Sequence, residues 1–563
     1  MTQKIDYRLP LLLIGGLIFE LLFWDEFLGL NLLLYSLFII AITFTDSDIP
    51  FHKNKLYTAL PHLAIATYIT YDNSMLAIIT WFITLLIYLG TAHFVMLKSS
   101  ITALVWGVLQ IISGPYGIIT KLKGTKLGKF NFKPILKPVK YIVLPLLMVI
   151  IFCSLYSAAN PIFDKYIRLV TDHISHFFNT IFNFFFIDIS LPKCLFLLLG
   201  ISITAGIIVG IKSKLLDDVE IGEDDQLTRK RRDIKKSSLF QDFRMLLAGN
   251  ETGKKLALKT ENIIGIISFT ALNLLLLFLN AIDTATLWFN NAVDASKNFS
   301  AELHDGTNTL IFSIVIAMLI IVYFFSGNLN FYRKNKWIKL LAYIWIAQNI
   351  FLVLSVFHRD YDYIFYHGLT YKRIGVAVFA TLSLIGLATV YIKVAKQKSV
   401  FFLYRINSKI WYALLVLLSF VNWDALIVNY NLSNANRIKV DVNHLMSLSD
   451  KTLPLLVENR DLLIKHALIQ ASNEKQDYTE VVAPIDSVNA GIVKLQAPSA
   501  VVAPKLSEAE LKAQVAEQAK YNFNQRLDIR IDQFLKKQKT VSWLSFSYLK
   551  WEAMHNLKGK SSY

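Results

Sequence analysis

The densest group of residues that could do chemistry lies in one short segment between two apolar runs. Residues 358–373 read HRDYDYIFYHGLTYKR and bring acids, histidines and arginines together. A second polar group, around Asn422 and Asp424, closes the last apolar run. Ionisable side chains beside lipid are costly and mark candidate functional sites. The candidate cluster comprises Arg359, Asp360, Asp362, His367, Arg373, Asn422 and Asp424.

Two interpretations of this cluster are open. In the first, the helices are neighbours, Asp424 pairs with Arg359 or Arg373, and the side chains line a polar pocket. Asp360, His367 or Asp424 would then supply acid or base groups, provided that they come within hydrogen-bond reach around a cleft. In the second, the cluster is the polar cap of a short loop, neutralised by ion pairs and water.

A further set of polar residues lies inside or beside other apolar runs. Polar side chains in such positions commonly hydrogen-bond across helices. Two histidines make no metal site without a third ligand, and two cysteines make no disulfide framework. Phosphate-loop, dinucleotide-binding and metalloprotease motifs are absent from the sequence, so we expect neither metal nor cofactor. The candidate intramembrane polar residues are Glu20, His62, His93, Gln348 and Asn349.

The composition decides the class of protein that carries these residues. Of 563 residues 54% are hydrophobic and only 18% are charged, against about 25% charged in soluble proteins. The net charge of +17 would suggest nucleic acid on a soluble surface, but the lysines lie in short loops between apolar runs. This pattern predicts an all-α, polytopic transmembrane bundle, with the bilayer and its anionic headgroups as partners and no nucleic acid.

The apolar runs predict about eleven spans, since a spanning helix needs about 20 mostly apolar residues. A twelfth run, 101–112, is too short and is expected to lie partly in the cytoplasmic leaflet. The predicted spans are 9–24, 27–44, 57–71, 75–96, 141–160, 192–211, 262–281, 308–326, 338–357, 374–392 and 410–428.

Loop charge predicts which side each loop faces. Residues 121–140 hold seven lysines and no acid, and the loops at 333–339 and 393–409 are also basic without an acid. The alternate loops at 161–191 and 282–307 carry several aspartates. The positive-inside rule assigns the basic loops to the cytoplasm. The N-terminus is then cytoplasmic, and both the C-terminus and the 358–373 cluster are periplasmic.

The sequence divides into a bundle, 1–432, with cytoplasmic loops at 97–140 and 212–261, and a C-terminal region, 433–563. The C-terminal region has a linker near 482–505, followed by a helical stripe that includes Phe523, Leu527, Ile531 and Phe534. We expect this region to form a small helical extramembrane unit docked on the bundle.

The segments RDYDYIFYHGLTYKRIGV, VNWDALIVNYNLS and VDVNHLMSLSDKTLPLL resemble a bacterial multi-pass membrane family catalogued as a domain of unknown function, the 4153/4173 type. The resemblance covers roughly 340–460 and implies a bacterial inner-membrane protein without naming an activity. His367 stands where the family usually has Tyr or Phe. The matching residues are Arg359, Gly368, Leu369, Thr370, Arg373, Asn422, Asp424, Asn431, Asp441, Leu445, Leu448, Ser449, Asp450, Pro454 and Leu455.

Three functions follow from these patterns. The first is a non-enzymatic envelope scaffold, sensor or partner-binding protein that binds a protein through its C-terminal region. The second is a transporter or channel whose route is lined by the intramembrane polar residues. The third is a membrane enzyme that acts on a lipid-linked or periplasmic substrate. We rank them in this order.

Overall fold

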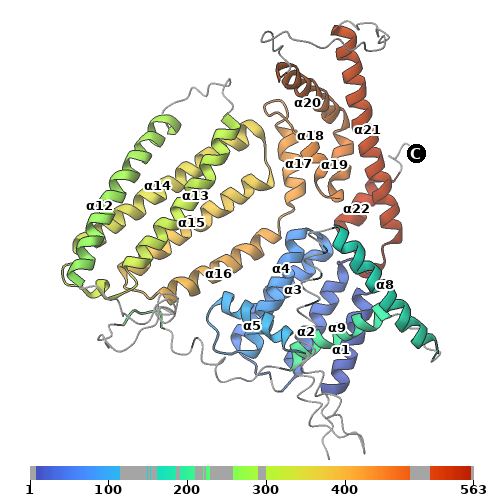
Figure 1. Ribbon diagram of the computed structural model, residues 1–563, viewed down its shortest axis with the longest axis horizontal. Coiled ribbons are helices and arrows are strands. Elements are labelled where there is room, and N and C mark those ends of the chain that lie inside the picture. Colours follow the sequence, from blue (N-terminus) through green and yellow to red (C-terminus); the bar gives the residue numbers. More distant parts are fainter. Residues whose placement is uncertain are drawn as a thin grey trace, which may run out of the picture.

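The computed structural model describes residues 8–47, 49–114, 161–184, 191–209, 224–228, 258–288, 299–481 and 508–558, together with the isolated positions 149, 153, 157 and 220. Within these residues the chain is helical and forms no β-strand, which confirms the predicted all-α class. Figure 1 shows two groups of apolar helices, with the C-terminal helices packed at one end.

The first group contains the N-terminal helices and one helix from the middle of the chain. Its closest contact is between α4 and α5, where Gly90 and Gly107 bring the backbones together: a Cβ at either glycine would lie 1.9 Å from a carbonyl oxygen of the other helix. Small residues allow this approach between membrane helices. A further helix, α8 (Pro161–Phe184), packs against α9. The group comprises α1 (Arg8–Phe23), α2 (Leu30–Thr45), α3 (Lys53–Tyr71), α4 (Met75–His93), α5 (Ser100–Ile112) and α9 (Leu191–Ile208).

The second group packs around its own core, in which Phe269, Ile321, Ile338 and Leu387 are fully buried. Gln348 donates to Asn273 Oδ1 (3.1 Å) and so joins the helices Lys336–His367 and Leu258–Asp283. The group comprises α12 (Leu258–Asp283), η1 (Thr284–Trp288), α13 (Phe299–Phe324), η2 (Asn328–Phe331), α14 (Lys336–His367) and α15 (Tyr371–Ala395).

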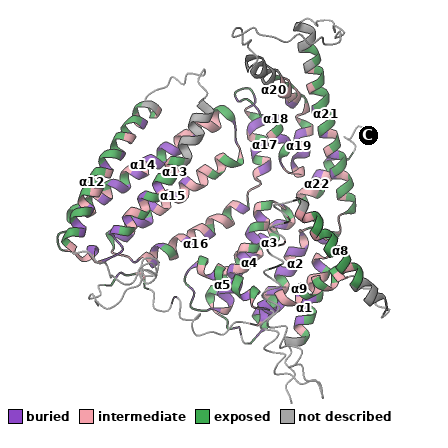
Figure 2. Ribbon diagram, viewed as in Figure 1, coloured by how far each residue is buried: buried purple, intermediate pink, exposed green. Residues whose placement is uncertain are grey.

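The outer surface of the second group is apolar. Leu274, Leu275 and Phe278 of α12 are 63%, 67% and 68% exposed, and Figure 2 shows exposed residues along the outer side of this helix. A contiguous apolar face of this kind is unfavourable in water. These side chains therefore face lipid, as a membrane-spanning helix requires.

One helix, α16 (Val400–Ser419), runs from the second group to the first. It packs against α15 at its start and against α3, α4 and α5 further along. The chain then turns at 420–422 and begins α17 (Trp423–Ser433). This turn interrupts the span predicted at 410–428, because Asn422 caps the new helix by accepting from Ala425 N at 3.2 Å.

The C-terminal helices share a core with α17, although the predicted division at 432 separates them. The predicted stripe is confirmed, since Phe523, Leu527, Ile531 and Phe534 are all buried in this core. The predicted linker, 482–505, lies outside the described residues. The helices are α18 (Val442–Ser447), η3 (Asp450–Thr452), α19 (Leu453–Glu458), α20 (Arg460–Val481), α21 (Glu508–Thr540), η4 (Trp543–Ser545) and α22 (Tyr548–Leu557).

The start of α16, which is the end far from α17, is held by part of the predicted loop 212–261. Arg405 donates to both carboxylate oxygens of Asp225 (3.0 and 2.5 Å), and Ser399 Oγ donates to Asp224 O (2.6 Å). Buried Glu220 accepts from Lys98 N, which lies between α4 and α5. Acidic residues of this loop therefore join the two helix groups at the end away from the C-terminal helices.

Six helices of the described part are long and apolar enough to cross a membrane: α4, α9, α12, α14, α15 and α16. Shorter apolar stretches lie in α1, α2, α5 and α13. The predicted span 57–71 forms most of α3, which contains Pro61, and the predicted span 141–160 falls almost wholly outside the described residues.

The close contact between α4 and α5 makes a direct prediction. Gly90→Ala forces a methyl group onto Ala103 O, so we expect it to lower the free energy of unfolding by about 1–3 kcal/mol. The matched control is Gly375→Ala, which meets no atom within 4 Å and should gain up to about 1 kcal/mol from helix propensity. Reversible denaturation in detergent measures both. Equal effects of the two substitutions would contradict the packing.

Candidate functional site

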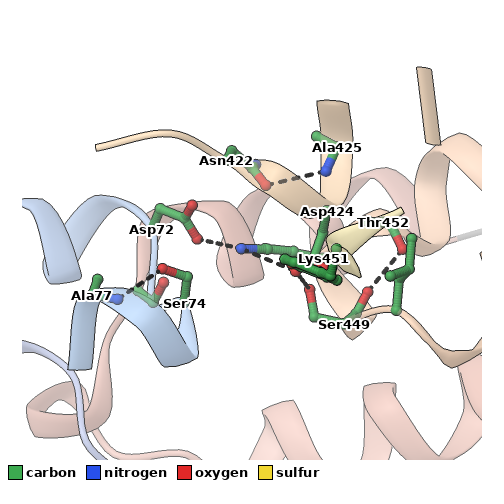
Figure 3. A network of polar contacts seen from close by, with 12 residues as sticks. Asp72, Ser74, Ala77, Asn422, Asp424, Ala425, Ser449, Lys451 and Thr452 are labelled. Atoms are coloured by element: carbon green, nitrogen blue, oxygen red, sulfur yellow. Dashed lines mark hydrogen bonds and ion pairs between the residues drawn. The ribbon is translucent and has the colours of Figure 1, made fainter. Parts of the chain in front are cut away.

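A buried ammonium group joins the C-terminal helices to the first helix group. Lys451 Nζ lies 2.6 Å from Asp72 Oδ1 and 3.4 Å from Asp424 Oδ2. The side chains of Lys451 and Asp72 are 3% and 0% exposed. Figure 3 shows the lysine reaching between the two carboxylates. We call Asp72, Asp424 and Lys451 the charged junction.

Local structure sets the position of each member. Asp72 ends α3, and its backbone N–H donates to Tyr68 O (2.7 Å). Asp424 lies in the first turn of α17, directly after the Asn422 cap. Lys451 lies in η3, a turn that is followed at once by Pro454 in the first turn of α19. Proline fixes the backbone there, so the turn directs Lys451 away from its own helices and towards the first group.

Neutral donors complete the coordination of Asp424. Tyr371 OH donates to its Oδ1 and Ser449 Oγ to its Oδ2, each at 2.6 Å. Two carboxylates share one ammonium, so these hydroxyl groups stabilise the excess negative charge by hydrogen bonding. Removing one partner from a buried ion pair leaves a buried charge uncompensated, which costs about 3–5 kcal/mol. The charged junction is therefore fully occupied by contacts within the chain.

A second ionic contact fastens α21 beside the junction. Arg530 donates to Asp450 Oδ1 at 3.0 and 2.9 Å and also to the carbonyl oxygens of Met446 and Leu448. Two residues earlier in α21, Asp528 accepts two bonds of 3.0 Å from Arg460 of α20. These contacts hold α21 against the turn that carries Lys451.

Lys550 of α22 lies near the junction but differs from Lys451. Among the described residues no carboxylate is in ion-pair contact with it. Burial, together with the charges of Lys537 and Lys451, lowers the pKa of Lys550 below its ordinary value. The two lysines thus differ: Lys451 lies between two carboxylates, whereas Lys550 makes no direct ion pair and is within the electrostatic range of both acids and lysines.

The predicted cluster at 358–373 caps the end of α14. Arg359 pairs with buried Asp283 of α12, and His358 lies 3.5 Å from Asp362 one turn later. Arg373 donates to His367 O at 2.9 Å and to Gly368 O. His367 and Arg373 both stack on Tyr363, and buried Asp360 lies within the electrostatic range of Arg373.

The predicted partner of Asp424 was wrong. Asp424 pairs with Lys451, not with Arg359 or Arg373. The two predicted polar groups nevertheless meet, because Tyr371 of the 358–373 segment donates to Asp424. Their arginines bond elsewhere: Arg359 joins α14 to α12, and Arg373 holds the α14–α15 connection.

The contacts of Gly368, Leu369 and Asn431 account for these three of the residues that match the family motif. Asn431 accepts from Leu369 N (2.7 Å) and donates to Leu369 O (2.9 Å), so one amide satisfies both backbone groups of that residue. Gly368 has φ +81°, and a Cβ there would lie 2.3 Å from Asn431 Oδ1. Glycine is required by both the conformation and the contact. This clamp ties α17 to the α14–α15 connection.

The intramembrane polar residues lie at separate places in the two helix groups. Glu20 lies 3.7 Å from Lys193, His62 Nδ1 lies 3.0 Å from Thr84 Oγ1, and His93 Nε2 lies 2.7 Å from Ile207 O. Gln348 bonds to Asn273, and Asn349 donates to Trp345 O in its own helix. Glu20, His62, His93 and Gln348 thus contact a neighbouring helix, whereas Asn349 bonds within its own. In the described residues no group of three His, Cys, Asp or Glu could hold a metal ion.

Sequence reasoning missed Asp72, Asp283 and Lys451. Asp72 lies in a short turn between two apolar helices, where it reads as an ordinary loop residue. Lys451 is the one cation between Leu448 and Leu455, and a lysine inside an apolar motif is the signal that could have identified it.

Exposed apolar helices and a buried charged junction define an integral membrane protein whose C-terminal helices dock on its own membrane helices. The family model described as Domain of unknown function (DUF4153) matches residues 19–459. The match covers more than half of the chain, so the chain belongs to this family, as the motifs predict. No curated protein and no solved structure matches the chain.

Removing the cation of the charged junction should strongly lower the free energy of unfolding. Lys451→Met leaves Asp72 and Asp424 buried without an ammonium group, and we expect a loss of about 3–5 kcal/mol in the free energy of unfolding. Asp72→Asn keeps the Asp424 pair and should cost less. Lys372→Met, at an exposed lysine of α15, is the control and should change stability by under about 0.5 kcal/mol. Denaturation in detergent measures all three, and a Lys451 variant as stable as the control would refute the junction's role.

Proposed function

We propose that this protein is a non-enzymatic membrane scaffold that presents its C-terminal helices to a protein partner. The observation that carries the proposal is the charged junction. Its acids and its lysine are held by one another and by hydroxyl groups of the same chain. Saturated groups of this kind suit a rigid mount better than a catalytic site, which needs an acid or base free to meet a substrate.

The surface offered to the partner is the long helical pair α20–α21. It extends away from the two membrane groups in Figure 1. The apolar stripe of α21 is buried against the chain itself, while Tyr521 and Ile529 on the other side are 60% and 50% exposed. Exposed aromatic and aliphatic residues on a polar helix are typical of protein contact sites. The family match ends at residue 459, so this pair lies beyond the matched region.

The topology that goes with this proposal has about eleven spans in a bacterial inner membrane. The N-terminus and the basic loops face the cytoplasm, where the lysines bind anionic headgroups. The C-terminal helices, the charged junction and the 358–373 cap lie on the periplasmic side. The acidic residues Glu220, Asp224 and Asp225 and the basic loop ends lie at the other end of the same helices, which supports one consistent orientation.

Cysteine labelling tests this orientation. With Cys153 and Cys194 replaced by alanine, we expect Gln525→Cys to react with a membrane-impermeant maleimide in intact cells. Lys334→Cys, exposed at the other end of the second group, should react only after the membrane is opened. The positive-inside assignment gives the reason. The reverse labelling pattern would overturn the orientation.

Site-specific photo-crosslinking tests the scaffold function. A photoreactive amino acid at Tyr521 or Ile529 should give one discrete adduct with the same partner in cells. The same amino acid at Lys372, which is exposed but outside α20–α21, should not give that adduct. Deletion of 460–563 should abolish the phenotype of the full-length protein. A chain that keeps its phenotype after this deletion and shows no discrete adduct would refute the proposal.

A further inference from the structure

The segment between α21 and α22 is attached to the turns of the first helix group. Glu26, in the α1–α2 turn, accepts from Ser542 Oγ (2.5 Å) and Ser545 Oγ (2.7 Å). Ser545 also donates to Phe27 O (2.9 Å), and Ser547 Oγ to Tyr71 O (3.4 Å) at the end of α3. The segment therefore lies at the level where α1, α2 and α3 leave the bilayer.

Gly29 shows how close this attachment is. A Cβ at Gly29 would lie 2.6 Å from the backbone carbon of Ser545. The α1–α2 turn and η4 thus pack backbone against backbone, which leaves no room for a layer of water or lipid between them. The aromatic side chains that η4 and α22 carry are consequently fixed at this depth.

Large aromatic side chains are exposed around this attachment. Tyr71 stacks on Tyr548 with ring centroids 5.5 Å apart, and Tyr548 packs near Trp551 at 6.0 Å. Tryptophan and tyrosine collect where the bilayer meets water, because one side of the ring is apolar and the other can hydrogen-bond. We call these residues the aromatic rim: Phe27, Tyr71, Trp543, Phe546, Tyr548 and Trp551, with exposed fractions of 54%, 49%, 67%, 37%, 39% and 44%.

Two lysines that form no direct ion pair among the described residues lie within the same surface. Lys537 Nζ lies 4.6 Å from the centre of the Phe27 ring. Lys550, on α22, is intermediate in exposure and has no ion-pair partner among the described residues. The nearby carboxylate of Glu26 already accepts from two serines. Asp450 and Asp72 act on Lys550 only beyond ion-pair distance, so an anion from outside the chain would give these lysines a direct ionic partner.

We propose that the aromatic rim, with Lys537 and Lys550, binds the phosphate-bearing headgroup layer of the membrane in which the protein is embedded. The rings lie among the glycerol and upper acyl groups, and the two ammonium groups contact lipid phosphates. The lipid surface is the occupant because the rim continues the ends of membrane helices at a fixed depth. The proposal rests on the membrane embedding of the chain and not on partner binding by α20–α21.

Fluorine NMR with paramagnetic lipids tests the rim. The full chain is labelled with 5-fluorotryptophan and placed in nanodiscs of phosphatidylethanolamine and phosphatidylglycerol that contain a headgroup-spin-labelled lipid. Trp543→Phe and Trp551→Phe assign the two resonances. We expect both to broaden several-fold more than the resonance of Tyr521→Trp, an exposed position on α21 further from the attachment. Broadening no greater than that of this control would overturn the proposal. A rim covered by another protein or by a second copy of the chain would give that result.

A second measurement tests the lysines. With lipids spin-labelled near the top of the acyl chain, broadening of the Trp551 resonance should be greater for phosphatidylglycerol than for phosphatidylcholine. Lys537→Gln and Lys550→Gln should each reduce this preference by about fivefold, while Lys520→Gln on the distal part of α21 should not. An unchanged preference in the Lys537 variant and in the double variant would refute the phosphate contact. The partner adduct at Tyr521 reports separately on the scaffold function.

Discussion

A buried lysine ammonium group is desolvated and needs negative charge close by to compensate for the lost hydration. For Lys451 this charge comes from two separate parts of the chain. Asp72 comes from the turn between α3 and α4, and Asp424 comes from the first turn of α17. Removing either carboxylate would leave the remaining charges of the junction buried without full compensation. The position of η3 against the first helix group depends on this contact. The helices that follow η3 are then placed by Asp450 with Arg530 and by Asp528 with Arg460.

The second helix group is held by a different chemistry. There the clamp between Asn431 and Leu369 is neutral, and Gly368 leaves the space for it. A neutral amide pair is less sensitive to loss of one partner than a buried ion pair, but it is more demanding in geometry. The α17 helix therefore contacts the second group directly, through Asn431 and through the bond from Tyr371 to Asp424. It is linked to the first group through Lys451, which bridges Asp424 and Asp72. It is the element on which both groups converge.

Much of this arrangement could be predicted from periodicity and composition. The apolar runs gave the helices, and the spacing of Phe523, Leu527, Ile531 and Phe534 gave the buried face of α21. The pairing of charges could not be predicted, because Asp72 and Lys451 are far apart in the sequence and nothing local relates them. The span at 410–428 was also misjudged: its apolar residues continue through 420–422, whereas the cap at Asn422 begins a new helix. Hydropathy reports burial in lipid, but a helix boundary is decided by where a backbone N–H finds its acceptor.

The α16 helix has a mechanical consequence. It is fastened near its first turns by Arg405 to Asp225, and at its last residue Ser419 bonds to Thr80 of α4 at 2.6 Å. Its 20 residues span about 30 Å as a stiff rod, about the thickness of the hydrocarbon layer. Its two attachments, Arg405 and Ser419, lie about 21 Å apart on the same rod. A displacement of the acidic loop at one end would therefore tilt the rod and shift α17 at the other, so the two ends of this helix cannot move independently.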